Sequence, residues 1–211
     1  MAQVKDQVGQ AISTIQAADV GLEAINDLSG QARAIAQQAQ NTNDPTERAR
    51  LADQFNQIRV QIDSMAADSG IGGNNLIGSS PDTLEVSLNE DGSSSLSVQG
   101  ADSTSAGLGI SARTFGSDAD IDAALADISS ALTQVRSNST SLSSNTSTLQ
   151  NRIDFTDSLS NTLEQGAANL TQADLNEEAA SLLSLQTRQA LGANALTIAT
   201  DNERAVLSLF S

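Results

Sequence analysis

Apolar residues in the first forty positions recur at alternating steps of four and three residues. This heptad spacing is typical of a helix that packs along a narrow seam. The series is Val4, Val8, Ala11, Ile15, Ala18, Leu22 and Ile25. It then shifts by a step of three to Leu28 and continues at Ala32, Ile35 and Ala39, a change that overwinds a coiled coil locally. We expect one helix over residues 2–40, which at about 1.5 Å per residue is roughly 58 Å long and therefore belongs to an extended bundle.

A second periodic segment follows a short interruption. Asp44 suits a helix N-cap, Pro45 suits the first helical position, and Glu47 has the spacing of a capping box. We expect a helix over residues 45–66. Its apolar positions are again separated by four and three residues: Leu51, Phe55, Ile58, Ile62 and Met65. Because the connection is short, the two helices should pack antiparallel.

The character of the chain changes over residues 68–117, which begin with glycines and asparagines that tolerate turns. Apolar and polar residues then alternate, as in a strand with one buried face. Two such runs flank Asp91-Gly92, a dipeptide that favours a tight turn. The apolar positions are Leu84, Val86 and Leu88, then Leu96 and Val98. The pattern predicts a small β-hairpin within an otherwise irregular insert.

Helical periodicity returns over residues 118–165. The apolar positions are Ile121, Leu125, Ile128, Leu132, Val135, Leu142, Leu149, Ile153 and Leu163. Small polar residues hold the intervening seam positions: Ser139, Thr146, Thr156 and Ser160. A seam diluted in this way gives a helix little stability of its own. We therefore expect the helix to pack against neighbours, which the small residues allow to approach closely.

A final helix is predicted over residues 167–211, starting at a potential cap between Thr171 and Asp174. Its apolar residues occupy more than one stripe, and a helix that is apolar over most of its girth is normally buried on several sides. Nothing else in the chain remains to cover it. We therefore predict self-association through these residues: Leu182, Leu183, Leu185, Leu191, Leu196, Ile198, Val206, Leu207, Leu209 and Phe210.

The elements together predict a mainly α fold. It consists of a long antiparallel helical rod, similar to a coiled-coil bundle, with a small β-hairpin insert and a carboxy-terminal helix. Two domains are predicted, a rod over residues 1–166 and a coiled-coil helix over residues 167–211. Aromatic residues make up only 2% of the 211 residues. A rod tolerates this scarcity, because helices that meet along a seam can pack with aliphatic side chains alone.

Composition disfavours several classes of function. The formal net charge is −16 at pH 7, which disfavours binding to nucleic acid or to an anionic membrane surface. The chain has no Cys and no His, so it can form no disulfide, thiolate metal site or histidine-based catalytic centre. Glu177 and Glu178 are adjacent on a predicted helix and so do not face each other as a catalytic pair would. We expect no enzymatic activity and no cofactor or metal.

Two stretches of the chain resemble bacterial flagellins. Residues 171–210, TQADLNEEAASLLSLQTRQALGANALTIATDNERAVLSLF, are similar to the carboxy-terminal end of that family in its alphaproteobacterial style. Residues 8–44, VGQAISTIQAADVGLEAINDLSGQARAIAQQAQNTND, are similar to the first long helix of the flagellin core. The resemblance extends over nearly the whole chain, and the carboxy-terminal motif is its more specific half.

The resemblance implies a layered fold in which the two ends of the chain pack together. Residues 2–166 would form the helical rod with its hairpin. Residues from about 167 onward would form the carboxy-terminal half of an inner coiled coil. Flagellins also have an amino-terminal segment upstream of the first rod helix, which supplies the other half. Because Met1 falls inside the region that matches this rod helix, we expect the chain to lack that segment.

The resemblance also points to one surface patch. In many flagellins the first rod helix carries an Arg-Glu-Leu triplet that an animal innate immune receptor recognises. The matching positions here are Arg33, Ala34 and Ile35. The arginine is present and the glutamate is absent, so the resemblance implies weak recognition by that receptor.

The leading hypothesis is a structural role as a subunit of the extracellular flagellar filament, which assembles by helix–helix contact for motility. Implied partners are neighbouring subunits, a flagellar export chaperone, and cap or junction proteins. Two alternatives stay open: a hook–filament junction protein and a flagellin-like surface adhesin or binding module. The insert over residues 68–117 is short for a junction protein, and it has almost no aromatic residue to stack on an adhesin's ligand.

Overall fold

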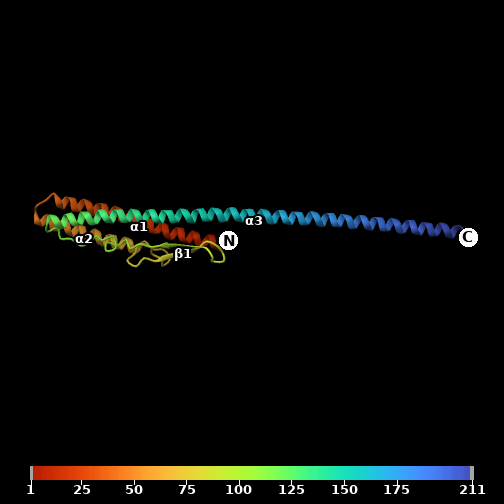
Figure 1. The fold of residues 1–211 in the computed structure, drawn as a ribbon, viewed down its shortest axis with the longest axis horizontal. Helices are drawn as coiled ribbons and strands as arrows, with labels where there is room; N and C mark the ends of the chain where they lie inside the picture. Colours follow the sequence, from red (N-terminus) through yellow and green to blue (C-terminus); the bar gives the residue numbers. More distant parts are fainter. Residues whose placement is uncertain (1, 210–211) are drawn as a thin grey trace. The chain divides into compact units, whose positions relative to one another are not determined.

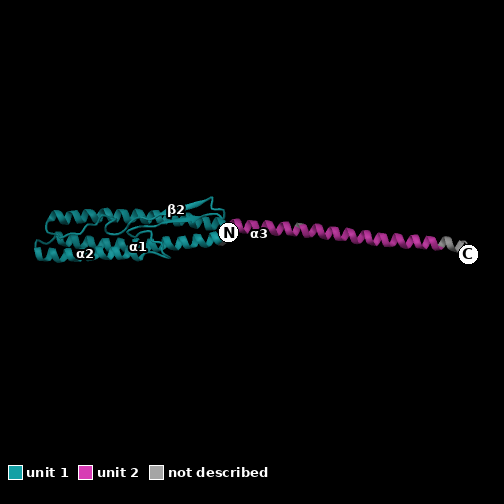
Figure 2. Cartoon of the chain, turned by 90° about the horizontal axis from the view of Figure 1, so that it is seen from below, with its two compact units in different colours: residues 1–156 teal, residues 157–211 magenta. Residues whose placement is uncertain are grey.

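The computed structural model describes residues 2–209, without the side chains of residues 2, 173 and 205–209. Its elements are, in order, α1 (Ala2–Gln40), α2 (Pro45–Asp68), β1 (Thr83–Ser87), β2 (Ser95–Gln99) and α3 (Asp118–Leu209) (Figure 1). The predicted fold class, long helices with a small β-hairpin, is confirmed. The chain divides into two compact units, Met1–Thr156 and Asp157–Ser211 (Figure 2).

Helices α1 and α2 run antiparallel, as their short connection predicted. At the end of α2 remote from that connection, the C-cap residue Ser69 lies against Gly21 of α1. A Cβ at Gly21 would stand 2.0 Å from Ser69 Oγ, so the close approach of the two segments depends on glycine there. The side chains that fill the seam between the helices are fully buried: Leu22, Ile25, Leu51, Phe55 and Ile62.

The seam of α1 keeps one heptad register along its whole length, so the predicted shift at Leu28 is wrong. Leu28 is only partly buried, whereas Ser29 has no exposed surface. Beyond it Ala36 is buried and Ile35 only partly so. The register therefore passes through a serine, which a search for apolar positions does not recognise. Within the described part of the chain, Ser29 Oγ is a buried atom without a hydrogen-bond partner.

Replacing Ser29 with alanine is expected to stabilise unit 1. The change removes an unsatisfied buried hydroxyl and introduces a better helix former, so the free energy of unfolding should rise by about 1 kcal/mol. Urea denaturation followed by circular dichroism measures this. Thr14→Val is the control, since Thr14 is also a buried polar residue but its hydroxyl donates to the Gln10 carbonyl at 3.1 Å. A destabilised Ser29→Ala variant would show that the hydroxyl does have a partner.

Asp44 caps α2, as predicted. Its Oδ1 accepts the N–H of Thr46 at 2.9 Å, and Pro45 opens the helix. The predicted capping box is not completed, however. The N–H of Asp44 donates to Thr42 Oγ1 at 3.2 Å, while the Glu47 carboxylate accepts from Arg50 Nε at 2.9 Å. A charged donor one turn away competes successfully for that carboxylate.

The first part of α3, residues 118–156, completes the rod of unit 1. Asp122 Oδ1 accepts from Gln40 Nε2 at 2.9 Å, and Ser139 Oγ donates to Asp19 Oδ1 at 2.6 Å. The order of these contacts makes α3 antiparallel to α1 (Figure 2). Ser139 is one of the small polar seam residues, and its hydroxyl here bonds a neighbouring helix.

The predicted β-hairpin is present, with its turn around Asp91-Gly92. β1 and β2 are antiparallel, with Leu84 opposite Val98 and Val86 opposite Leu96. Gly92 has a φ of 70°, a left-handed conformation that favours glycine at the turn. Val86 and Val98 are buried against the helices, whereas Glu85 is exposed. The alternation of apolar and polar residues in the sequence therefore corresponds to a hairpin with one buried face.

The predicted boundary after residue 165 and the new helix start between Thr171 and Asp174 are wrong, because α3 continues to Leu209. Thr171 Oγ1 donates to the Ala167 carbonyl one turn earlier, at 2.9 Å. A threonine hydroxyl can be satisfied inside a helix in this way and need not cap one. The compact units divide between Thr156 and Asp157, and the domain assignment 1–166 and 167–211 stays a prediction.

Candidate self-assembly surface

Large apolar side chains are exposed along the part of α3 that belongs to unit 2. Leu182 is 51% exposed and Leu196 is 71% exposed. The other exposed apolar side chains of this segment are Leu159, Leu163, Leu170, Leu175, Leu183, Leu185, Leu191 and Ile198. We call these ten residues the leucine surface. A row of this size is unusual for a surface that faces only water.

Six of the predicted self-association residues belong to the leucine surface: Leu182, Leu183, Leu185, Leu191, Leu196 and Ile198. The side chains of Val206, Leu207 and Leu209 lie outside the described residues, as does Phe210 altogether. The surface begins earlier than predicted, at Leu159. Leu163 continues the periodicity of residues 118–165, so the sequence pattern assigned it to the rod.

Unit 1 has a second structured region, the connector between β2 and α3, which the sequence predicted only as irregular. Three polar side chains of α2, spaced along one face of the helix, hold its backbone. Asn56 accepts the Arg113 N–H at 3.2 Å and donates to the Arg113 carbonyl at 2.8 Å. Arg59 Nε donates to the Ile110 carbonyl at 2.8 Å, and Asp63 accepts the Ser105 N–H at 2.7 Å. The connector is therefore an integral layer of the rod.

Arg113 joins the connector to the start of α3. Its guanidinium contacts Asp127 at 2.6 Å and Asp120 at 3.2 Å. The Asp127 hydrogen bond is the main cause that raises the pKa of Arg113. Burial raises the pKa of Asp120, but hydrogen bonds from the Thr114 and Phe115 N–H groups and from Arg113 outweigh it, so that pKa lies below its usual value.

This cluster predicts that unit 1 loses stability in acid. Because the pKa of Asp120 is lower in the folded chain, its carboxylate stabilises the fold above the unfolded pKa of about 3.9, and that contribution is lost as pH falls through the folded value. Asp120→Asn should be less stable than the parent chain at neutral pH, and the difference should shrink below about pH 4. Urea denaturation across this range measures it, with Asp53→Asn on exposed α2 surface as control. A constant difference at every pH would contradict the assignment.

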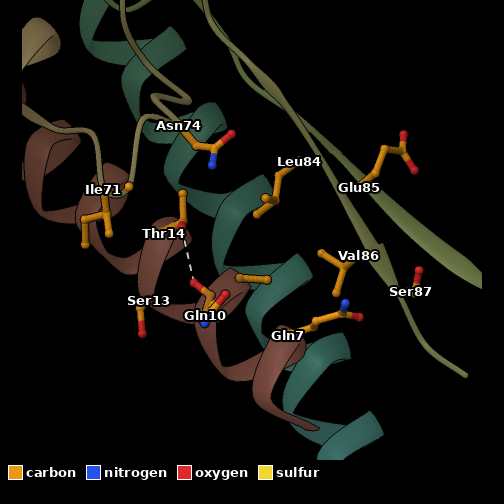
Figure 3. A pocket seen from close by; sticks show the side chains of 12 residues that line it. Gln7, Gln10, Ser13, Thr14, Ile71, Asn74, Leu84, Glu85, Val86 and Ser87 are labelled. Carbon is orange, nitrogen blue, oxygen red and sulfur yellow. Dashed lines mark hydrogen bonds between the residues drawn. The ribbon is translucent and has the colours of Figure 1, made fainter. Parts of the chain in front are cut away.

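A groove of about 570 Å³ lies between α1 and the hairpin (Figure 3). One wall consists of α1 side chains, including Gln7, Gln10 and Ser13, and the other consists of β1 from Leu84 to Ser87. Ile71 and Asn74 of the loop after α2 also line it. Leu84 and Val86 point toward the helix, whereas Glu85 and Ser87 point away (Figure 3). No pattern of residues in the sequence indicated this groove.

Sites for other chemistry are not found in the described part of the chain. Among these residues, no group of His, Cys, Asp or Glu side chains could hold a metal ion. No helix of the same residues is long and apolar enough to cross a membrane.

Curated relatives of the chain decide its family. Flagellin FljK of Caulobacter vibrioides is 32% identical over 209 residues, which cover 98% of this chain and 76% of FljK. The chain belongs to the flagellin family. Flagellin A of Rhizobium meliloti is 46% identical over 57 residues, 27% of this chain and 14% of its own. These relatives confirm the resemblance to alphaproteobacterial flagellins that residues 171–210 suggested.

A solved structure has the same fold as this flagellin. The crystal structure of Bacillus cereus flagellin matches with a TM-score of 0.64 and 19% sequence identity, over 71% of this chain and 88% of that one. No protein-family model matches the chain. The rod with its hairpin is thus a flagellin fold, at a sequence identity too low to carry residue roles across.

The three positions that match the receptor triplet lie on α1 of this flagellin. Arg33 and Ala34 are exposed and Ile35 is half-buried. Arg33 and Ala34 line a surface groove whose far side is formed by Leu132 and Arg136 of α3. The fold therefore brings two arginines, 103 positions apart in the numbering, to one groove.

Proposed function

We propose that this flagellin is a structural subunit of the bacterial flagellar filament, outside the cell, and that it assembles through the leucine surface. The observation that carries the proposal is the exposure of this surface, from Leu159 to Ile198, on one helix. Burying apolar area contributes roughly 25 cal/mol per Å². Contact with neighbouring helices is therefore the strongest stabilisation still available to unit 2.

The proposal gives the two parts of the chain different roles. Residues 1–166 act as a rod that keeps its shape without a partner, since its core is buried within the chain. Residues 167–211 act as a coiled-coil helix that becomes buried on assembly. The leucine surface overlaps both, because it begins at Leu159. We further propose an export chaperone and cap or junction proteins as partners, and no enzymatic role.

Seeded growth tests the proposed function. The chain is offered to short filament seeds by itself and joined at its amino end to the amino-terminal helix of flagellin FljK, and the products are imaged by electron microscopy. We expect long filaments from at least the joined form. A product that stops after a single ring would instead indicate a junction protein. A chain that stays monomeric in both forms and binds surfaces would indicate an adhesin.

We expect this chain to activate the innate receptor only weakly, because Ala34 occupies the position of the glutamate in the receptor triplet. Loss of a charged partner at an interface costs about 2 kcal/mol or more, roughly a thirtyfold loss in affinity. A reporter-cell assay should show a much lower response than to a strongly stimulatory flagellin, and Ala34→Glu should raise it. Gln31→Glu, which adds the same charge to the same groove, should not. Full activation by the unchanged chain would refute this reading of the patch.

A further inference from the structure

The groove of Figure 3 runs along the outer edge of β1. The sheet has two strands in the order β1–β2, so each strand has one edge without a neighbour. Four consecutive residues of β1 line the groove, together with α1 and the loop after α2, and no residue of β2 lines it. The groove therefore lies on the side of β1 that faces away from β2.

The register identifies the backbone groups on this edge. Leu88 N–H donates to the Ser94 carbonyl at 2.8 Å, and Gly100 N–H donates to the Asp82 carbonyl at 3.1 Å. Residues of an antiparallel pair alternate between bonding their partner strand and facing outward. The even-numbered residues of β1 therefore bond β2, and the N–H and C=O groups of Thr83, Glu85 and Ser87 face outward. In the described chain these outward groups have no hydrogen-bond partner.

The walls of the groove suit an extended peptide. A free strand edge can pair with the backbone of an added strand, and pockets for alternate side chains then select its sequence. Ala11, Leu84 and Val86 provide apolar surface, while Gln7, Gln10 and Ser13 provide amide and hydroxyl groups. The volume of about 570 Å³ lies within the range of binding clefts, roughly 300–1,000 Å³. The volume of the groove and the side chains that line it are therefore suited to a short extended peptide.

Charge selects the kind of peptide. Among the described residues that line the groove, Glu85 is the only charged one, and its side chain lies on the face of β1 away from α1 (Figure 3). On an antiparallel pair, the residue directly opposite shares that face, and an opposite charge there is favourable. A lysine or arginine is therefore the preferred residue opposite Glu85, with apolar neighbours opposite Leu84 and Val86.

A second copy of the chain does not supply such a peptide. The chain has ten basic residues, and nine of them lie in α1, α2 or α3. The tenth, Arg113, lies in the connector, where it is paired with Asp120 and Asp127. No described extended segment of another copy thus presents a free basic side chain.

We propose that the groove between α1 and β1 binds an extended basic peptide of a different protein, which adds to β1 as an antiparallel third strand. The backbone of the peptide pairs with Thr83, Glu85 and Ser87, and its central lysine or arginine pairs with the Glu85 carboxylate. This site is distinct from the leucine surface and does not depend on filament assembly.

Binding of a designed probe tests the proposal. The probe is fluorescein-labelled threonyl-valyl-lysyl-valyl-threonine amide, and its fluorescence anisotropy is followed as the full chain is added. Glu85→Pro removes an outward N–H donor together with the Glu85 carboxylate, and it leaves the bonds to β2 intact, since proline is tolerated where the N–H faces away from the ladder. We expect it to weaken binding about tenfold. Ser97→Pro makes the same backbone change on the outer edge of β2 and should leave binding unchanged.

Charge exchange provides an independent readout. A probe with glutamate in place of the central lysine should bind the parent chain about fivefold more weakly, and Glu85→Lys should reverse this preference. Protection of the Leu88 and Gly100 amides from hydrogen exchange shows that the hairpin of each variant remains paired. The proposal is overturned if the lysine probe fails to bind at millimolar concentration. It is equally overturned if Glu85→Pro and Ser97→Pro bind alike, or if Glu85→Lys does not change the preference.

Discussion

Replacing Leu182 and Leu196 together with aspartate is expected to abolish filament growth while unit 1 stays folded. The two leucines are exposed in the single chain, so the change costs the monomer little. In a filament they would be buried between helices, and each buried carboxylate without a partner costs several kcal/mol. The monomer concentration needed for growth should rise by more than about a thousandfold. Seeded growth followed by electron microscopy measures this.

A matched variant separates burial from charge. Gln189→Glu with Asn194→Asp adds two negative charges to the same helix at positions that are already polar, and we expect it to allow growth. The melting of unit 1, followed by circular dichroism, should be the same in both variants. Growth of the Leu182→Asp/Leu196→Asp chain at the parent concentration would show that assembly uses another surface. Loss of the melting transition of unit 1 would show that unit 1 does not fold independently of unit 2.

Replacing Phe55 with alanine should destabilise unit 1 by about 3–5 kcal/mol. Phe55 of α2 and Phe115 of the connector are both fully buried, with ring centroids 5.3 Å apart and planes inclined at 57°. Phe115 also has a φ of 54°, which is unfavourable for a bulky residue. Packing against Phe55 offsets that strain. Loss of the Phe55 ring therefore destabilises the connector as well as α2. Urea denaturation of the parent and variant chains measures the difference.

The chain offers a close control for this substitution. Phe155→Ala removes the same side chain at a site that is 53% exposed, where the ring contacts the Arg152 guanidinium at 5.1 Å. An exposed cation–π contact contributes about 0.5–1 kcal/mol, so the loss should be several times smaller. Equal losses in the two variants would mean that the Phe55–Phe115 pair is not the centre of the core.

The hairpin and the cap of α2 were predictable because each depends on a short stretch of chain. Period-two alternation around Asp91-Gly92 specifies a hairpin, and Asp44-Pro45 specifies a helix start. The predictions were wrong where a polar side chain has two possible hydrogen-bond partners. Thr171 bonds within α3 and does not cap a new helix, and Glu47 bonds Arg50 and not the N-cap backbone. The local sequence contains both options, and neighbouring groups select one.

Periodicity and the motif in residues 171–210 were enough to determine the long helices, the hairpin and the flagellin family, because these follow from residues close together in the chain. Only the tertiary structure decided which distant segments meet. It placed Ser29 in the seam, attached the connector to α2 through Asn56, and put α1 beside the free edge of β1. Such contacts depend on packing between helices, since a polar side chain looks the same in the sequence whether it faces water or another segment.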